Sequence, residues 1–167
     1  MTPLAFTPFE QLPEACRRVA TAARAAGLEI GIHVLDQSSR TAEKAAEACG
    51  TTVGQIVKSL VFAQEQGTRP VLLLVSGANR VKESLVGEVL GETIVRPDAD
   101  FVRNATGFAI GGIPPLGHAE PLATYIDEDL LAHGIVWAAA GTPNSVFAVD
   151  PKALMLACGA TAIAVTD

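Results

Sequence analysis

Apolar residues along the chain follow two spacings, which alternate from the N-terminal to the C-terminal end. Stretches with apolar residues on one helical face alternate with short, nearly continuous apolar runs, which are typical of buried strands. Residues that favour helix ends, such as Thr41, Asp98 and Gly50, bound several of the helical stretches. The pattern predicts helices over 13–26, 41–50, 82–90, 98–106 and 151–158. It predicts strands over 30–35, 56–63, 70–75, 122–126, 135–140, 145–149 and 161–165, a short helical turn over 52–55 and a polar turn containing Gly67.

Helices and strands alternate in this pattern, but without the regular strand–helix–strand rhythm of a doubly wound fold. We therefore predict an α/β (α+β) protein with a mixed sheet and helices packed around it. The 167 residues fit one domain and are too few for two comfortable cores, so we expect 1–167 to be a single domain.

Composition and charge narrow the function classes. Hydrophobic residues make up 49% of the chain, which excludes general disorder. A formal charge of -6 argues against a protein that wraps DNA. No apolar run is long enough to span a membrane, and residues 1–10 lack the features of a secretory signal. Cys16, Cys49 and Cys158 have no metal-ligand spacing, so we expect a cytoplasmic protein with buried thiols and neither metal nor cofactor.

Lys58 is the first candidate for chemistry, because it interrupts the apolar run 56–63. An ammonium group buried without a partner is costly. One interpretation is a strand-edge lysine whose stem lies on apolar surface while its head reaches water. The other, which we favour, places the ammonium in a pocket, where it binds a phosphate or a carbonyl oxygen.

The second candidate is the segment 111–118, which holds two glycines, two prolines and His118. Gly111 and Gly112 permit a close backbone approach to a ligand, and Pro114 and Pro115 stiffen the rest of the segment. Free amides in such a loop can hold an oxyanion, although an ordinary turn has the same composition. His118 is interpreted either as a general base or ribose contact, or as a histidine that faces solvent.

The third candidate is the segment 140–145, which joins two predicted strands. It is either a plain turn or a loop that offers Thr142 and Asn144 as neutral contacts to a small ligand. The chain has no phosphate-binding loop of the P-loop type, no dinucleotide-binding glycine motif, no HExxH and no GxSxG. These absences disfavour ATPase, dehydrogenase, zinc protease and α/β-hydrolase chemistry.

Three segments together, 51–62, 111–115 and 140–147, resemble the YbaK family. Members of this family are free-standing relatives of the editing (insertion) domain of bacterial prolyl-tRNA synthetase. The resemblance covers the chain from about Ile30 to its end, and it implies a partly barrel-like mixed sheet surrounded by helices.

The resemblance implies an aminoacyl-tRNA deacylase that acts in trans on misacylated tRNA. The implied substrate is a tRNA for proline that carries alanine, cysteine or serine. Lys58 corresponds to the family's pocket lysine, and Gly111 and Pro115 to its G-x-x-x-P loop. We expect Lys58, Gly111 and Gly112 to be catalytic. The residues expected to bind substrate are Ser59, Ile56, Ile113, Pro114, Pro115, His118, Thr142 and Asn144.

The limited selectivity of synthetases agrees with this implication. Synthetases cannot exclude smaller amino acids by binding alone, because a missing methylene changes binding by only about 1–3 kcal/mol. An ester is already activated, so its hydrolysis needs orientation and oxyanion stabilisation more than a strong nucleophile.

The implied partner is the acceptor end of misacylated tRNA. A synthetase or an elongation factor is a further candidate partner, and we expect binding to neither a membrane nor DNA. Two alternatives remain open. One is a non-catalytic module that binds an aminoacyl or nucleotide end, and the other is an enzyme that acts on free aminoacyl esters.

Overall fold

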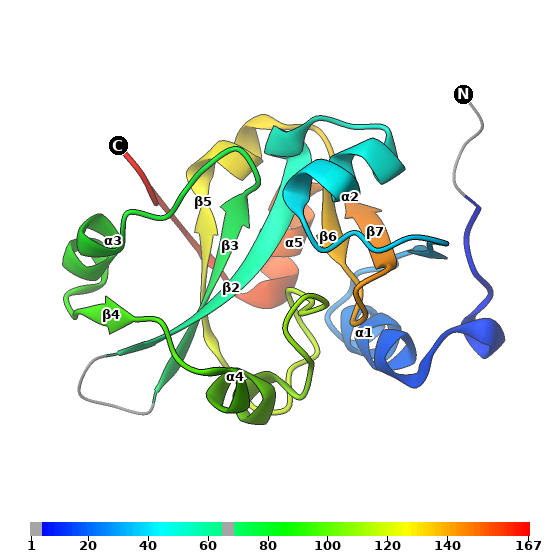
Figure 1. The fold of residues 1–167 in the computed structure, drawn as a ribbon, viewed down its shortest axis with the longest axis horizontal. Coiled ribbons are helices and arrows are strands. Elements are labelled where there is room, and N and C mark those ends of the chain that lie inside the picture. The colour runs from blue at the N-terminus through cyan, green and yellow to red at the C-terminus, as the bar shows by residue number, and fades with distance from the viewer. Residues whose placement is uncertain (1–4, 65–68) are drawn as a thin grey trace.

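The computed structural model describes residues 5–64 and 69–167 (Figure 1). The predicted turn at Gly67 and the first four residues of the chain lie outside the described residues. Within the described ranges the α-helices are α1 (Glu14–Ala25), α2 (Ala42–Cys49), α3 (Glu83–Leu90), α4 (Ala99–Thr106) and α5 (Pro151–Cys158). The strands are β1 (Ile32–Val34), β2 (Ile56–Gln64), β3 (Pro70–Ser76), β4 (Ile94–Val95), β5 (Ala123–Asp127), β6 (Val136–Ala139), β7 (Ser145–Val149) and β8 (Thr161–Ile163). Short 3₁₀ turns lie at Phe9–Gln11, Val53–Gln55 and Glu128–Ala132.

The N-terminal boundaries of α2 and α4 confirm the prediction, because the expected side chains cap them. Thr41 accepts a hydrogen bond from Lys44 N at 3.2 Å, and Asp98 accepts one from Phe101 N at 2.8 Å. The predicted capping box of Thr52 closes the turn before β2. All predicted strands are present, although β1 is shorter than expected, and β4 was not predicted because two residues carry no periodic pattern.

All strands of the described residues belong to one mixed sheet, with the order β1-β7-β6-β2-β3-β5-β8 and with β4 beside the far end of β2. Parallel pairing joins β2 to β6, β3 to β5 and β5 to β8, whereas the other pairs are antiparallel. Figure 1 shows β2 as a long strand, which runs from the region of α2 toward β4. The predicted mixed sheet with surrounding helices is confirmed.

Helices and loops bury both faces of this sheet. On one face, β2 contributes Val57 and Val61 to a core that includes residues of α1, α4, α5 and the Gly/Pro loop. On the other face, Phe62 packs in a second core with residues of α3, β4 and the C-terminal end. Ile56 packs against α2 in a third, small cluster. In the ranges that the structure describes, no helix has the length and apolar character needed to cross a membrane.

Candidate active site

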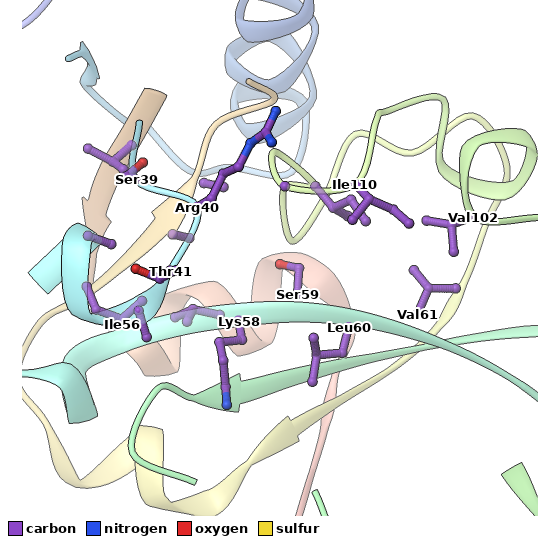
Figure 2. Close-up of a pocket in the computed structure, with 18 of the residues that line it drawn as sticks. Ser39, Arg40, Thr41, Ile56, Lys58, Ser59, Leu60, Val61, Val102 and Ile110 are labelled. Carbon is purple, nitrogen blue, oxygen red and sulfur yellow. The ribbon is translucent and has the colours of Figure 1, made fainter. Parts of the chain in front are cut away.

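The pairing of β2 creates the main cavity, because its neighbour changes along its length. On the edge opposite β3, β6 pairs with β2 at Ile56 and Val57, and β4 pairs with it at Ala63 and Gln64. Between these pairings, the described strands place no partner beside residues 58–62. A cavity of about 390 Å³ lies along this open edge. Its walls are formed by strands β2, β6 and β7 and by residues of three loops and two helices (Figure 2). These residues are 39–42, Ala45, 96–97, Val102, Ile110, Gly111 and Ile113.

Ser59 lies on the same face of β2 as Val57 and Val61, because side chains alternate along a strand. Ser59 lines the cavity, and in Figure 2 its hydroxyl points to the side of β2 on which Arg40 and Ile110 lie. Its Oγ is buried and has no hydrogen-bond partner among the described residues. Buried hydroxyls are normally satisfied, so this one is a candidate contact for a ligand.

Lys58 lines the same cavity but lies on the opposite face of β2 from Ser59. Its ammonium donates a hydrogen bond to Asn79 O at 2.6 Å. Burial lowers the pKa of Lys58 below its ordinary value, while Glu43 acts in the opposite direction. The ammonium therefore points to the other side of β2 from Ser59 and Ile110, toward a partner that the sequence did not predict, although Lys58 and Gly111 both line the cavity.

The residue whose carbonyl holds Lys58 belongs to a polar network around the buried Asp127. The Asn79 side chain donates to the carboxylates of Asp127 and Asp129, each at 2.8 Å. Asp127 is 1% exposed and also accepts from Ser76 N at 3.0 Å. Asp127 therefore fixes the Asn79 segment, and through it the position of the Lys58 ammonium.

The Gly/Pro loop begins with a tight turn over residues 109–112. Gly112 N donates to Ala109 O at 3.2 Å, and Gly111 has a φ of 103°, which favours glycine strongly at the third position of a type II turn. The Gly112 amide is thus already used, which corrects the expectation that both glycine amides are free for a ligand. In the described chain, Gly111 N–H makes no hydrogen bond, and Gly111 lines the cavity.

Gly112 lies where two loops touch. A Cβ built on it would lie 2.6 to 2.9 Å from the backbone of Thr142, which leaves no room for a side chain. The Thr142 hydroxyl lies 3.0 Å from Asn144 Oδ1 and 2.7 Å from Ser145 Oγ, and the Asn144 amide donates to Leu35 O at 2.8 Å. Thr142 and Asn144 do not line the main cavity; their hydrogen bonds shape the loop that supports Gly112.

His118 lies outside the main cavity as well, and so do Pro114 and Pro115. The His118 ring lies with Nε2 2.7 Å from Pro114 O and edge-on to Phe108. Burial lowers the pKa of His118, against the opposing effect of this hydrogen bond. His118 borders a separate hollow beside α1, so the structure does not bring it to Lys58 or Gly111.

Two arginines line the cavity that the sequence did not single out. Arg40 lies against the turn, since a Cβ on Gly111 would be 3.3 Å from its Nε. Arg96 lies 5.7 Å over the Phe62 ring and donates to Glu83 at 3.2 Å. The one feature of the sequence that could have identified them is their position, because each arginine lies shortly before the N-cap of a helix.

The described ionisable side chains that line the cavity are all cationic, namely Arg40, Lys58 and Arg96. The N-terminal end of α2 adds positive potential at Thr41 and Ala42. Across the described residues, no cluster of three or more His, Cys, Asp or Glu side chains suits a metal ion. The site can therefore bind anionic groups at its rim and hold a small acyl group inside, with Gly111 N–H available to a carbonyl oxygen.

Comparisons with known proteins agree with this geometry. Residues 36–156 match the family described as the aminoacyl-tRNA editing domain. The uncharacterized protein YwhH of Bacillus subtilis (strain 168) is 32% identical over 119 residues, which cover 71% of this chain and 75% of that protein. Proline–tRNA ligase of Limosilactobacillus fermentum is 30% identical over 129 residues, or 75% of this chain, but these cover only 20% of the ligase.

A crystal structure of a protein described as a candidate trans-editing enzyme for prolyl tRNA synthetase is also similar. It superposes with a TM-score of 0.88 and 44% identity, over 94% of this chain and 99% of that one.

Proposed function

This chain belongs to the aminoacyl-tRNA editing domain family, and from that premise we propose that it removes wrongly attached amino acids from tRNA in trans. It hydrolyses the ester between the amino acid and the tRNA 3′ end. The observation that carries the proposal is the cavity in which a cationic rim, a free glycine amide and an apolar interior meet. The similarity to a proline–tRNA ligase and to a candidate trans-editing enzyme supports a tRNA for proline as the substrate.

The apolar interior supports a small amino acid as the cargo. Val61, Val102 and Ile113 line it, so a short side chain gains apolar contact there. Binding alone discriminates poorly between amino acids that differ by one methylene, which is why a second, size-limited pocket is useful after a synthetase. Alanine, cysteine and serine remain the proposed cargoes.

The cations at the rim bind the nucleic acid end of the substrate. Arg40 and Lys58 both line the cavity, on opposite sides of β2 in Figure 2, and from there they contact the phosphate and ribose of the terminal nucleotide. To do so, Lys58 exchanges its hydrogen bond to Asn79 O for one to the ligand.

Gly111 N–H donates to the ester carbonyl and stabilises the negative charge that develops on it. Water attacks the carbonyl carbon, and a ribose hydroxyl of the substrate assists the proton transfer, since none of the described side chains that line the cavity is a suitable base. The C–O bond to the ribose breaks, the ribose oxygen takes a proton, and the free amino acid leaves. Ile56 and Ser59 complete the wall that faces the acyl group.

The partner implied by this function is misacylated tRNA. We further propose a prolyl-tRNA synthetase as a partner, a cytoplasmic location, and a single functional unit over residues 1–167. The role of an elongation factor stays a prediction.

Hydrolysis of a panel of charged tRNAs tests the proposal. A tRNA for proline is charged with alanine, cysteine, serine or proline and incubated with the wild type, with Lys58→Ala and with Lys152→Ala. Lys152 is an exposed lysine of α5 and serves as the matched control. We expect selective hydrolysis of at least one misacylated form, a loss of roughly 10- to 100-fold in Lys58→Ala, and no change in Lys152→Ala.

Two results would contradict the proposal. Binding of the charged tRNAs without hydrolysis would identify a non-catalytic module. Equal hydrolysis of free aminoacyl esters and of charged tRNA would identify a small-molecule esterase.

A further inference from the structure

The backbone of β2 presents unused hydrogen-bonding groups to the cavity. Gly77 N donates to Ile56 O at 2.7 Å and Gln64 N donates to Arg69 O at 3.2 Å, so the even-numbered residues of β2 direct their backbone groups to the β3 side. Because successive residues of a strand alternate, the odd-numbered residues direct theirs to the opposite edge.

Along that edge, Val57 is paired with β6 and Ala63 with β4, but the two odd-numbered residues between them have no strand partner in the described chain. The carbonyl groups of Ser59 and Val61 therefore face the open edge, in the strand segment that lines the cavity. A strand edge of this kind is a ready acceptor for hydrogen-bond donors of a ligand.

The side chain of Ser59 adds a third acceptor. Its Oγ is buried and lacks a partner in the described residues, and Ser59 is one of the residues that line the same cavity. It is not suited to act as a nucleophile, because the described ionisable side chains of the cavity wall are Arg40, Lys58 and Arg96, and none of these cations is a base that would activate it. Its hydroxyl can instead form a hydrogen bond with a ligand.

The charges around the cavity show which ligand group needs these acceptors. Among the described residues, no carboxylate lines the cavity, so an amino group that enters it finds no ion-pair partner in the wall. An α-amino group has two or three N–H donors, and each must be paired once it leaves water. The neutral oxygens on the open edge of β2 are acceptors of this kind, and they lie beside the apolar interior.

We propose that the middle of β2 is the recognition site for the α-amino group of the amino acid, through Ser59 Oγ and the carbonyls of Ser59 and Val61. This inference rests on the proposed function and names the part of the substrate that the strand reads. It means that the enzyme distinguishes an aminoacyl ester from an acyl ester of the same size that lacks the amino group.

A pair of matched substrates tests this inference. One is the tRNA carrying the best amino acid of the panel, and the other carries the same acyl group without its α-amino group, for alanine a propionyl ester. Each kcat/KM is divided by the rate of uncatalysed hydrolysis of the same ester, which removes the difference in intrinsic reactivity. The proteins are the wild type, Ser59→Ala, and Ser84→Ala as a control with an exposed serine of α3.

We expect the wild type to accelerate hydrolysis of the aminoacyl ester at least tenfold more than that of the propionyl ester. Ser59→Ala loses about tenfold on the aminoacyl ester and less than about twofold on the propionyl ester, as one lost hydrogen bond to a charged group predicts. Ser84→Ala matches the wild type on both. Thermal unfolding checks that Ser59→Ala is folded, which a change from hydroxymethyl to methyl permits.

The outcomes separate the two proposals. Equal acceleration of both esters, or an equal loss on both in Ser59→Ala, overturns recognition of the amino group while leaving the deacylase intact. A wild type that accelerates neither ester overturns the proposed function, and the inference with it.

Discussion

Replacement of Gly112 by alanine tests whether the contact between the Gly/Pro loop and the 140–145 loop shapes the active site. The new Cβ would lie 2.6 Å from the Thr142 carbonyl carbon and 2.7 Å from its Cα, and both atoms belong to the backbone. A flexible side chain could move aside, but here one of the two loops must shift. Thr142 is held by its hydrogen bonds to Ser145, so the displacement falls on the turn that carries Gly111.

The size of the effect can be worked out from this overlap. Overpacking of a closely packed site costs about 1–3 kcal/mol. For a chain of this length, each kcal/mol lowers Tm by about 2–4 °C, so we expect a decrease of about 2–12 °C. A shift of the turn by a fraction of an ångström to about 1 Å also moves the Gly111 N–H, which lowers kcat/KM by about 10- to 100-fold.

The assay combines thermal unfolding with deacylation, measured well below the Tm of the variant so that unfolding does not affect the rate. Gly134→Ala is the matched control, because a Cβ on Gly134 meets no atom within 4 Å and φ is not positive there. We expect this control to be neutral or slightly stabilising. An unchanged Tm in Gly112→Ala would refute the steric argument, and a lower Tm with full activity would show that the turn lies outside the reaction site.

Two further predictions concern polar groups behind the site. Burial lowers the pKa of His118 in the folded chain below the ordinary histidine value of about 6.5. As the pH falls through that value, the unfolded chain binds more protons than the folded one, so the free energy of unfolding should decrease. Urea unfolding at pH 7.5 and pH 5 should show this decrease to be smaller in His118→Gln, and an identical pH dependence would contradict it. Asp127→Ala should lower the free energy of unfolding by about 1–3 kcal/mol, because it leaves the buried Ser76 N–H unpaired and removes one of the two acceptors of the half-buried Asn79 amide. Asp129→Ala, which removes an exposed acceptor of the same amide, should cost less than about 0.5 kcal/mol, and equal losses would refute the role of burial.

The elements of the fold were predictable because their signals are local. Helix caps such as Thr41 and Asp98 act within one turn, and apolar runs mark strands wherever both faces are buried. The pairing of strands is not local, so the gap between β6 and β4 along β2 has no sequence signal. That gap forms the cavity. Lys58 could be selected from the sequence because it interrupts an apolar run, whereas its partner Asn79 could not, because their contact depends on the tertiary structure.

The two loops also show that contacts between distant residues cannot be predicted from local sequence. The glycines at 111 and 112 suggested two free amides, but the turn that Gly111 permits consumes the amide of Gly112. Thr142 and Asn144 suggested ligand contacts, yet each satisfies its side chain within the protein. Arg40 was missed because its importance comes from contact with Gly111, a residue far along the chain. Residue type indicates what a side chain can bind, whereas only the tertiary structure decides what it has already bound.

The opposite signs of the overall and the local charge fit a protein that acts on one end of a nucleic acid. A net charge of -6 opposes extended contact with a phosphate backbone, and the salt-dependent affinity of nucleic-acid binding grows with the number of phosphates neutralised. Three cationic residues, Arg40, Lys58 and Arg96, line the cavity together with Gly111 and the free edge of β2. Such an arrangement attracts a terminal nucleotide and its ester more than it attracts a helix. Selectivity then depends on the fit of the acyl group inside the cavity, which is the property that an editing enzyme needs.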